Sequence, residues 1–191
     1  MKVLLLDGSD KDDVSLNCVS TAIERILNNK YELNVFVLRD LVIHNCIGCY
    51  GCWLKTPGRC IIDDVSRKIT DLAARSSVWI FLTPVVYGGY SWHLKKAVDR
   101  MLPLFLPFFT KRDEETHHFM RCNNTPSLIV FGATNCNNKE SEDIFKSLVS
   151  RNSLNFSNSN SQSIILSGKD SVESIEEIIE NSLNKVGVLD E

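Results

Sequence analysis

The sequence lacks an excess of positive charge, a long apolar segment and a biased composition. Its 24 Asp and Glu residues outnumber its 21 Lys and Arg residues, so there is no basic surplus to bind a phosphate backbone. Apolar runs such as residues 3–6 and 78–82 fall far below the roughly 18 residues that cross a bilayer. With only 9 glycines and 5 prolines, the chain is neither collagen-like nor of low complexity. We therefore expect a folded protein with no nucleic-acid partner and no membrane partner.

A secretory signal and a disulfide framework are also missing. Lys2 is followed by only four apolar residues before Asp7, whereas the apolar part of a secretory signal takes about seven or more. The seven cysteines are odd in number, which argues against a scaffold held by disulfides. We therefore expect a cytoplasmic protein with reduced thiols.

The apolar pattern that is present predicts an α/β fold. Short apolar runs predict five strands, at residues 3–6, 33–38, 78–82, 128–131 and 163–166. Apolar residues at helical spacing predict helices between and after them, at residues 16–27, 65–73, 91–101, 142–149 and 175–186. Strands that alternate with helices need crossover connections, which produce a parallel sheet covered on both faces. The sequence therefore predicts a doubly wound sheet in a single domain over residues 1–191.

Polar residues mark several helix starts. Asp64 and Ser91 precede the second and third predicted helices and are residue types that cap helices. Asp170 and Glu173 have the spacing of a capping box before the last helix. We expect each of these side chains to bond the first turn of its helix.

Two long segments do not fit the strand and helix pattern. Residues 44–64 form a cysteine-rich loop, and residues 103–126 form an insertion that we expect to be irregular. In doubly wound sheets the ligand lies beyond the carboxyl ends of the strands, which selects the loops at residues 7–15, 83–91 and 132–138. Because the cysteine-rich loop follows the second strand, we expect it at the same edge, facing the ligand.

Two segments resemble a known family. Residues 83–91 read TPVVYGGYS and are followed by a helix over 94–100, which resembles the flavin loop and the next helix of flavodoxin-like NAD(P)H-dependent FMN reductases. The spacing of Cys46, Cys49, Cys52 and Cys60 resembles that in the branch of the family that includes iron-sulfur flavoproteins. The resemblance implies a flavodoxin-like five-stranded parallel sheet of order 2-1-3-4-5, bound FMN, a homodimer or homotetramer, and electron transfer from NAD(P)H to a small acceptor.

The resemblance also implies which residues bind FMN. In the first loop, Ser9 and Lys11 match residues that hold the phosphate, and Ser15 stands at a phosphate-binding position where an Asn is expected. The residues expected against the ring are those of the second loop: Pro84, Val85, Tyr87, Gly88 and Gly89. Glycines there leave the backbone open to a flat ring, and Tyr87 is placed to cover it. Hydride transfer to a flavin needs no protein acid or base, so we assign no catalytic residue.

The first loop departs from the family pattern. Leu16 stands where a Thr is expected, and Asp10, Asp12 and Asp13 bring negative charge to a phosphate site. Together these carboxylates are expected to weaken FMN binding by about tenfold to several hundredfold. Alternatively, Asp12 and Asp13 cap the first helix and complement its dipole.

The cysteine cluster has three interpretations. Two residues separate Cys46 from Cys49 and two separate Cys49 from Cys52, and Cys60 follows after seven more. Such a run suits a 4Fe-4S cluster with Cys60 as the fourth ligand. Zinc fits less well because its usual pattern is two separated cysteine pairs. The thiols could also form a reversible disulfide or pack the loop without metal.

Other residues have less specific interpretations. Lys95 and Asp99 are spaced for a surface ion pair, and Arg100 is expected to be structural. His117 and His118 point to opposite sides of any helix or strand, so we expect them to be exposed or at a subunit interface rather than in a two-histidine metal site. The insertion also contains an apolar patch suited to a subunit interface or a lid, formed by Phe105, Leu106, Phe108 and Phe109.

Three functions follow from these observations. The first is an FMN-dependent oxidoreductase in which NAD(P)H or a reduced protein delivers electrons through the flavin to a small acceptor. The second is an iron-sulfur electron carrier that exchanges electrons with ferredoxin-like partners through a cluster on the four cysteines. The third is a flavin-free binding protein with a degenerate phosphate loop.

Overall fold

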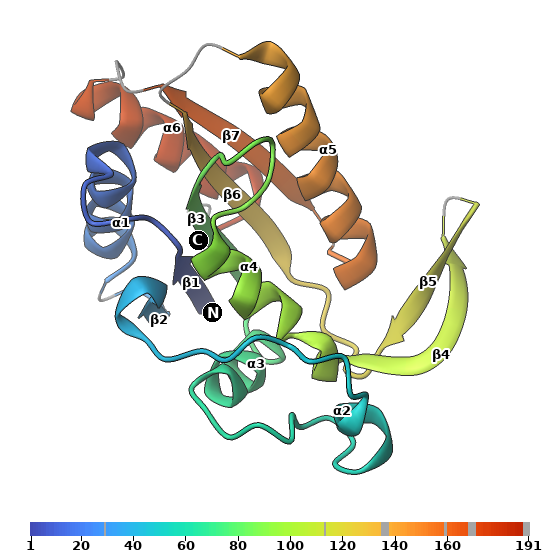
Figure 1. The fold of residues 1–191 in the computed structure, drawn as a ribbon. Coiled ribbons are helices and arrows are strands. Elements are labelled where there is room, and N and C mark those ends of the chain that lie inside the picture. Colours follow the sequence, from blue (N-terminus) through green and yellow to red (C-terminus); the bar gives the residue numbers. More distant parts are fainter. Residues whose placement is uncertain (29, 113, 135–137, 159, 168–170, 189–191) are drawn as a thin grey trace.

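The computed structural model describes residues 1–28, 30–112, 114–134, 138–158, 160–167 and 171–188. Its centre is a five-stranded parallel sheet of order β2-β1-β3-β6-β7 (Figure 1). The strands are β1 (Lys2–Asp7), β2 (Glu32–Val37), β3 (Val78–Pro84), β6 (Ser127–Thr134) and β7 (Ser161–Ser167). Counted within this sheet alone, the order is the predicted 2-1-3-4-5, so the flavodoxin-like doubly wound fold is confirmed.

Helices cover both faces of the sheet (Figure 1). One face packs against α1 (Val14–Leu27) and α6 (Val172–Lys185), and the other against α3 (Ser66–Ala73), α4 (Trp92–Asp99) and α5 (Lys139–Phe156). Successive side chains of a strand point to opposite faces, so Leu5 packs with α1 and Leu6 with α4. Because both are completely buried, the strands read as continuous apolar runs in the sequence.

One of the predicted helix caps is present as expected: the Ser91 hydroxyl accepts a hydrogen bond from the Leu94 N–H at the start of α4. Asp64 accepts one from the Ser66 N–H, but the N-cap residue of α3 is Val65. The predicted capping box of α6 is displaced, since Ser171 is the N-cap residue and Asp170 lies outside the described residues.

The insertion at 103–126 is ordered, so the expectation of an irregular segment was wrong. After a short 3-10 turn η2 (Leu102–Leu104), β4 (Phe105–Arg112) and β5 (Glu115–Met120) form an antiparallel hairpin that extends away from the main sheet (Figure 1). Pro107 and a shift of register between Phe105 and Phe109 interrupt the alternation that would have indicated a strand.

The cysteine-rich loop also contains some regular structure. It follows the 3-10 turn η1 (Leu38–Asp40) and includes a four-residue helix, α2 (Gly51–Leu54). All six cysteines for which a state is described are free thiols, and Cys136 lies outside the described residues. Within the described part of the chain, no helix has the length and apolar character of a membrane span.

Candidate functional site

Ser91 joins the loops that follow β1 and β3 at the carboxyl edge of the sheet. Its hydroxyl donates to the Gly8 carbonyl at 2.6 Å, and its N–H donates to the Thr83 hydroxyl at 2.8 Å. A Cβ at Gly8 would lie 2.7 Å from the Cβ of Leu94, so only glycine allows the first loop to lie this close to α4. The two loops that the sequence selects for ligand binding are therefore held side by side.

The loop after β3 contains a tight turn. Val86 and Gly89 exchange backbone hydrogen bonds of 3.0 and 2.8 Å, and the two residues between them have positive φ values of 50° for Tyr87 and 77° for Gly88. A Cβ at Gly88 would lie 2.5 Å from Cγ2 of Ile144 in α5. The glycine therefore serves the turn and its packing on α5, whereas Tyr87 is 98% exposed.

Two open depressions adjoin one another at this edge. The first, of about 770 Å³, lies at the start of α1 and is lined by Asp10, Lys11, Asp12, Asp13, Val14, Ser15 and Pro84. The second, of about 430 Å³, is lined by Asp13, Pro84, Val85, Val86, Tyr87, Ala133, Thr134, Asn138 and Ser141. Asp13 and Pro84 belong to both, so they mark the boundary between the two depressions.

The predicted flavin residues are divided among these features. Lys11 and Ser15 line the depression at α1, and Val85 and Tyr87 line the neighbouring one, with Pro84 between them. Gly88 and Gly89 lie in the turn that shapes the second depression. Ser9 is buried beneath the first loop.

Ser9 belongs to a buried polar cluster with Asp7 and Arg39. Both the backbone N–H and the hydroxyl of Ser9 donate to Oδ1 of Asp7, at 2.9 and 2.5 Å. Arg39 Nη1 lies 3.0 Å from Ser9 Oγ and 3.5 Å from Oδ2 of Asp7. The hydroxyl predicted to bind a phosphate is thus engaged by a carboxylate of the chain.

The start of α1 is also capped from within. The Leu16 N–H donates to Oδ1 of Asp13 at 3.1 Å, which confirms the alternative that Asp13 caps this helix. Burial raises the pKa of the Asp13 carboxyl, and the nearby Asp10 and Asp7 raise it further against the lowering effect of the Leu16 hydrogen bond. The charges nearest to Asp13 that affect its pKa are therefore negative.

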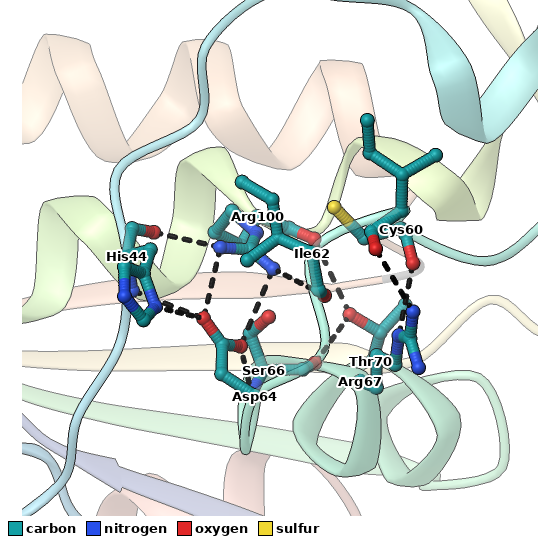
Figure 2. A network of polar contacts seen from close by, with 9 residues as sticks. His44, Cys60, Ile62, Asp64, Ser66, Arg67, Thr70 and Arg100 are labelled. Atoms are coloured by element: carbon teal, nitrogen blue, oxygen red, sulfur yellow. Dashed lines mark hydrogen bonds and ion pairs between the residues drawn. The ribbon is translucent and has the colours of Figure 1, made fainter.

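A separate buried network organises the cysteine-rich loop (Figure 2). Arg100, at the end of α4, donates to both oxygens of Asp64 at 3.0 and 3.3 Å and to the carbonyls of His44 and Ile62. The side chains of Arg100 and Asp64 are only 1% and 5% exposed. Burial acts to raise the pKa of Asp64, but hydrogen bonds from Ser66 and His44 outweigh it and hold that pKa well below its usual range.

A second arginine holds the end of the same loop. Arg67 donates to the carbonyls of Cys60 and Ile61 at 2.9 and 3.1 Å (Figure 2). Together with Arg100, it fixes the backbone on both sides of Ile62. The expectation that Arg100 is structural agrees with these contacts, and the Lys95–Asp99 ion pair is present at 2.6 Å.

The four clustered cysteines line one cavity of about 20 Å³ with Arg100 and Pro103. Burial raises the pKa of the Cys52 thiol, and its neighbours Cys60, Cys46 and Cys49 add to this effect. The chemistry of four thiols suits a cluster or a zinc ion. However, among the described residues no three His, Cys, Asp or Glu side chains are arranged as metal ligands, so cluster ligation stays a prediction.

The cysteine cavity does not face the two depressions, so that expectation was wrong. It lies at the end of α4, beside Asp99 and Arg100, whereas the depressions lie near Ser91 at its start. These ends are about 14 Å apart at the rise of an α-helix. From η1, residues 41–50 run without regular structure to α2 at the far end of α4 (Figure 1).

Aromatic contacts connect the cysteine-rich loop with the hairpin. The ring centroids of Tyr50 and Trp53 are 5.2 Å apart, those of Trp53 and His118 are 4.9 Å apart, and those of His118 and Phe109 are 4.6 Å apart. His117 points to the other side of β5, where it is buried and bonds Asn155 of α5 at 2.9 Å. The two histidines therefore diverge as predicted, but His117 is neither exposed nor free for another subunit.

Sequence reasoning missed Asp7, Arg39 and the pairing of Arg100 with Asp64. Asp7 is an acid that ends an apolar run, a signal for a functional position at a strand end. It pairs in register with Val37, which places Arg39 nearby once the order of strands is known. Nothing in the local sequence connects Arg100 with Asp64, which are 36 residues apart.

Comparison with known proteins identifies the family. A model of the NADPH-dependent FMN reductase family matches residues 1–132. The chain belongs to this family. It is also 34% identical over 110 residues to an iron-sulfur flavoprotein of Methanocaldococcus jannaschii, covering 56% of this chain and 55% of that protein. An iron-sulfur flavoprotein of Archaeoglobus fulgidus is 28% identical over 85 residues, covering 44% of this chain and 38% of that protein. The chain thus spans about half or less of the length of these relatives.

Solved structures of this family's fold resemble the whole chain. An NAD(P)H:quinone oxidoreductase from Methanothermobacter marburgensis superposes with a TM-score of 0.69 at 16% identity, covering 100% of this chain and 99% of that one. An FMN-dependent NADH-azoreductase from Bacillus anthracis, in complex with FMN, gives a TM-score of 0.62 at 12% identity, covering 97% and 98%. At these identities the likeness concerns the fold.

The buried Arg100–Asp64 pair predicts the effect of Asp64→Asn. Replacing the carboxylate leaves a buried guanidinium without its counter-charge, so the free energy of unfolding should fall by about 3–5 kcal/mol. Because the folded-state pKa of Asp64 is depressed, its contribution is complete at neutral pH and is lost as the pH falls below about 4. The variant should therefore lose less stability than the wild type over that acid range, as measured by urea unfolding.

The matched control is Asp63→Asn. Its carboxylate is 78% exposed and pairs with Arg67, four residues further along the chain. A pair whose carboxylate lies in solvent contributes about 0–1 kcal/mol, so the unfolding midpoint should barely move. Equal losses in the two variants would contradict the assignment of Asp64 as the buried anchor.

Proposed function

We propose that the protein is an NAD(P)H-dependent flavin oxidoreductase that transfers electrons through bound FMN to a small-molecule acceptor. The observation that carries this proposal is the pair of adjoining depressions at the carboxyl edge of the sheet, in a chain of the NADPH-dependent FMN reductase family. The second depression, of about 430 Å³, has a volume typical of small-ligand sites. Its walls include Pro84, Val85 and Ala133, which suit a flat, uncharged ring.

In this proposal, residues of the chain bind the flavin and orient it. Val85 donates its N–H to the Ala133 carbonyl at 2.8 Å, so the loops after β3 and β6 hold one wall in place. The turn at Tyr87 and Gly88 packs on α5 and sets the rim of the depression. A bound flavin supplies the redox chemistry by accepting a hydride, for which no protein acid or base is required.

A second candidate function is an iron-sulfur electron carrier. It is favoured by the placement of Cys46, Cys49, Cys52 and Cys60 around one cavity and by the names of the two relatives. Such a protein would exchange electrons with a ferredoxin-like partner.

Free thiols at these positions suit the reducing cytoplasm, in which we place the protein.

We infer that the protein assembles as a homodimer or homotetramer through the hairpin. Phe108 and Phe109 are 65% and 67% exposed on β4, and Phe119 of β5 is also exposed. Exposed aromatic side chains on a projecting hairpin are costly in water and suit an interface between copies.

Gly88→Ala tests the flavin proposal. The new Cβ would meet Ile144 at 2.5 Å and strain a backbone with positive φ, which displaces Tyr87 and Val86. The affinity for FMN should fall about tenfold, and NAD(P)H oxidation at limiting FMN should fall with it. Titration of flavin fluorescence measures the first, and absorbance at 340 nm the second.

Gly187→Ala is the control for this test. Gly187 also has a positive φ, of 71°, but nothing lies within 4 Å of its added Cβ. Flavin affinity should be unchanged, since the substitution adds strain without touching the site. A wild-type protein that binds no flavin would refute the proposal and favour the flavin-free binding protein.

Cys60→Ser tests the second candidate. Protein purified without air should contain iron and acid-labile sulfide, and the variant should lose most of both, because a cluster needs its fourth thiolate. Cys122→Ser, outside the cavity, should leave both unchanged. Zinc without sulfide, or no metal at all, would exclude the cluster and with it the electron carrier.

Replacing Phe108 and Phe109 together with Ser tests the assembly. Sedimentation should show an oligomer for the wild type and a monomer for the double variant, because the interface loses its apolar side chains. Val42→Ser removes an apolar side chain that lies outside the hairpin and is 74% exposed, so it should leave the oligomer intact. A monomeric wild type would end the proposal.

A further inference from the structure

Carboxylates of the chain itself engage three hydrogen-bond donors in the first loop and the first turn of α1. The N–H and hydroxyl of Ser9 both donate to Asp7, and the Leu16 N–H donates to Asp13. Ser9 and Asp7 are 0% and 1% exposed, so water does not compete for these bonds. A phosphate would have to displace these carboxylates to use the three donors, whereas Lys11 and Ser15 line the depression itself.

The charge around this depression is negative. Among the described residues that line it, the carboxylates of Asp10, Asp12 and Asp13 face the single cation Lys11. The guanidinium of Arg39 lies beneath the loop but bonds Asp7 and Ser9 there. Repulsion from each carboxylate lowers the affinity for an anion by about fivefold at a solvent-screened distance near 4 Å.

A histidine near the first loop does not offset the negative charge of the depression. His93 lies 3.8 Å from Asp10 across the start of α4. Burial lowers the pKa of His93, and the nearby Asp10 only partly opposes this, which favours the neutral imidazole. Asp10 therefore keeps its full effect on an anion in the depression.

The neighbouring depression is lined largely by apolar residues. Pro84, Val85, Val86 and Ala133 form much of its lining, and Asp13 enters it only at the boundary with the first depression. An uncharged ring can lie there without burying a charge or leaving one unpaired. The ring end of the site is therefore suited to a flavin, whereas the residues at the other end do not fit a phosphate dianion.

We propose that this site recognises a flavin by its ring and uncharged side chain and gains nothing from its phosphate. Riboflavin then binds at least as tightly as FMN. The proposal rests on the proposed function, because it concerns the specificity of the same flavin site.

Equilibrium titration with riboflavin and with FMN tests this proposal. Flavin fluorescence gives both dissociation constants for the full-length protein at pH 7.5, and the constant for FMN should equal or exceed that for riboflavin. Asp12→Asn should tighten FMN about fivefold, and Asp10→Asn with Asp12→Asn about 25-fold. Neither variant should change the riboflavin constant more than about twofold, because riboflavin carries no phosphate charge.

Asp71→Asn is the matched control. It removes the same charge from an exposed position on α3, remote from the first loop, and should change neither constant. Tenfold or tighter binding of FMN over riboflavin in the wild type, or no gain for FMN in the double variant, would overturn the inference and leave the proposed function standing. Failure of both flavins to bind would overturn both.

Discussion

The buried pair of Arg100 and Asp64 is the interaction on which the order of the cysteine-rich loop depends. A guanidinium that is 1% exposed needs partners in the protein, and it finds them in Asp64 and in carbonyls at both ends of the loop. The loop between His44 and Asp64 is thereby closed on the end of α4. A long segment with little regular structure would otherwise lose much conformational freedom with few contacts in return.

Helix α4 then acts as the spacer between the two candidate centres. Ser91 at its start holds the loops of the candidate flavin site, and Arg100 at its end holds the cysteine cavity. Both ends are anchored by the residues that flank the helix, so the separation is set by its length. Electrons passing between a flavin and a cluster in one chain would have to cross this distance. The exposed aromatic hairpin lies beside the cysteine-rich loop, which places a candidate contact surface there.

The sheet was predictable because its strands are short, continuous apolar runs, as residues 3–6 show. The hairpin was not, because Pro107 and the register shift hide its alternation. The expectation that the cysteine-rich loop lies at the ligand edge failed for another reason. The rule on strand ends governs where a loop begins, and a loop of this length can return along the molecule to a distant partner such as Arg100. Contacts between residues far apart in sequence, such as Arg39 with Ser9, follow only from the assembled fold.

The first loop shows how a chain can retain the shape of an anion site while altering its specificity. Asp7 and Asp13 are tethered to the donors that they engage, so they act at a high effective concentration that a free phosphate must match. The loop is therefore already paired and ordered in the protein alone. Since the donors of Ser9 and Leu16 are engaged by carboxylates, selectivity depends on the wall built from Pro84, Val85 and Ala133, which fits the shape of a ring rather than a charge.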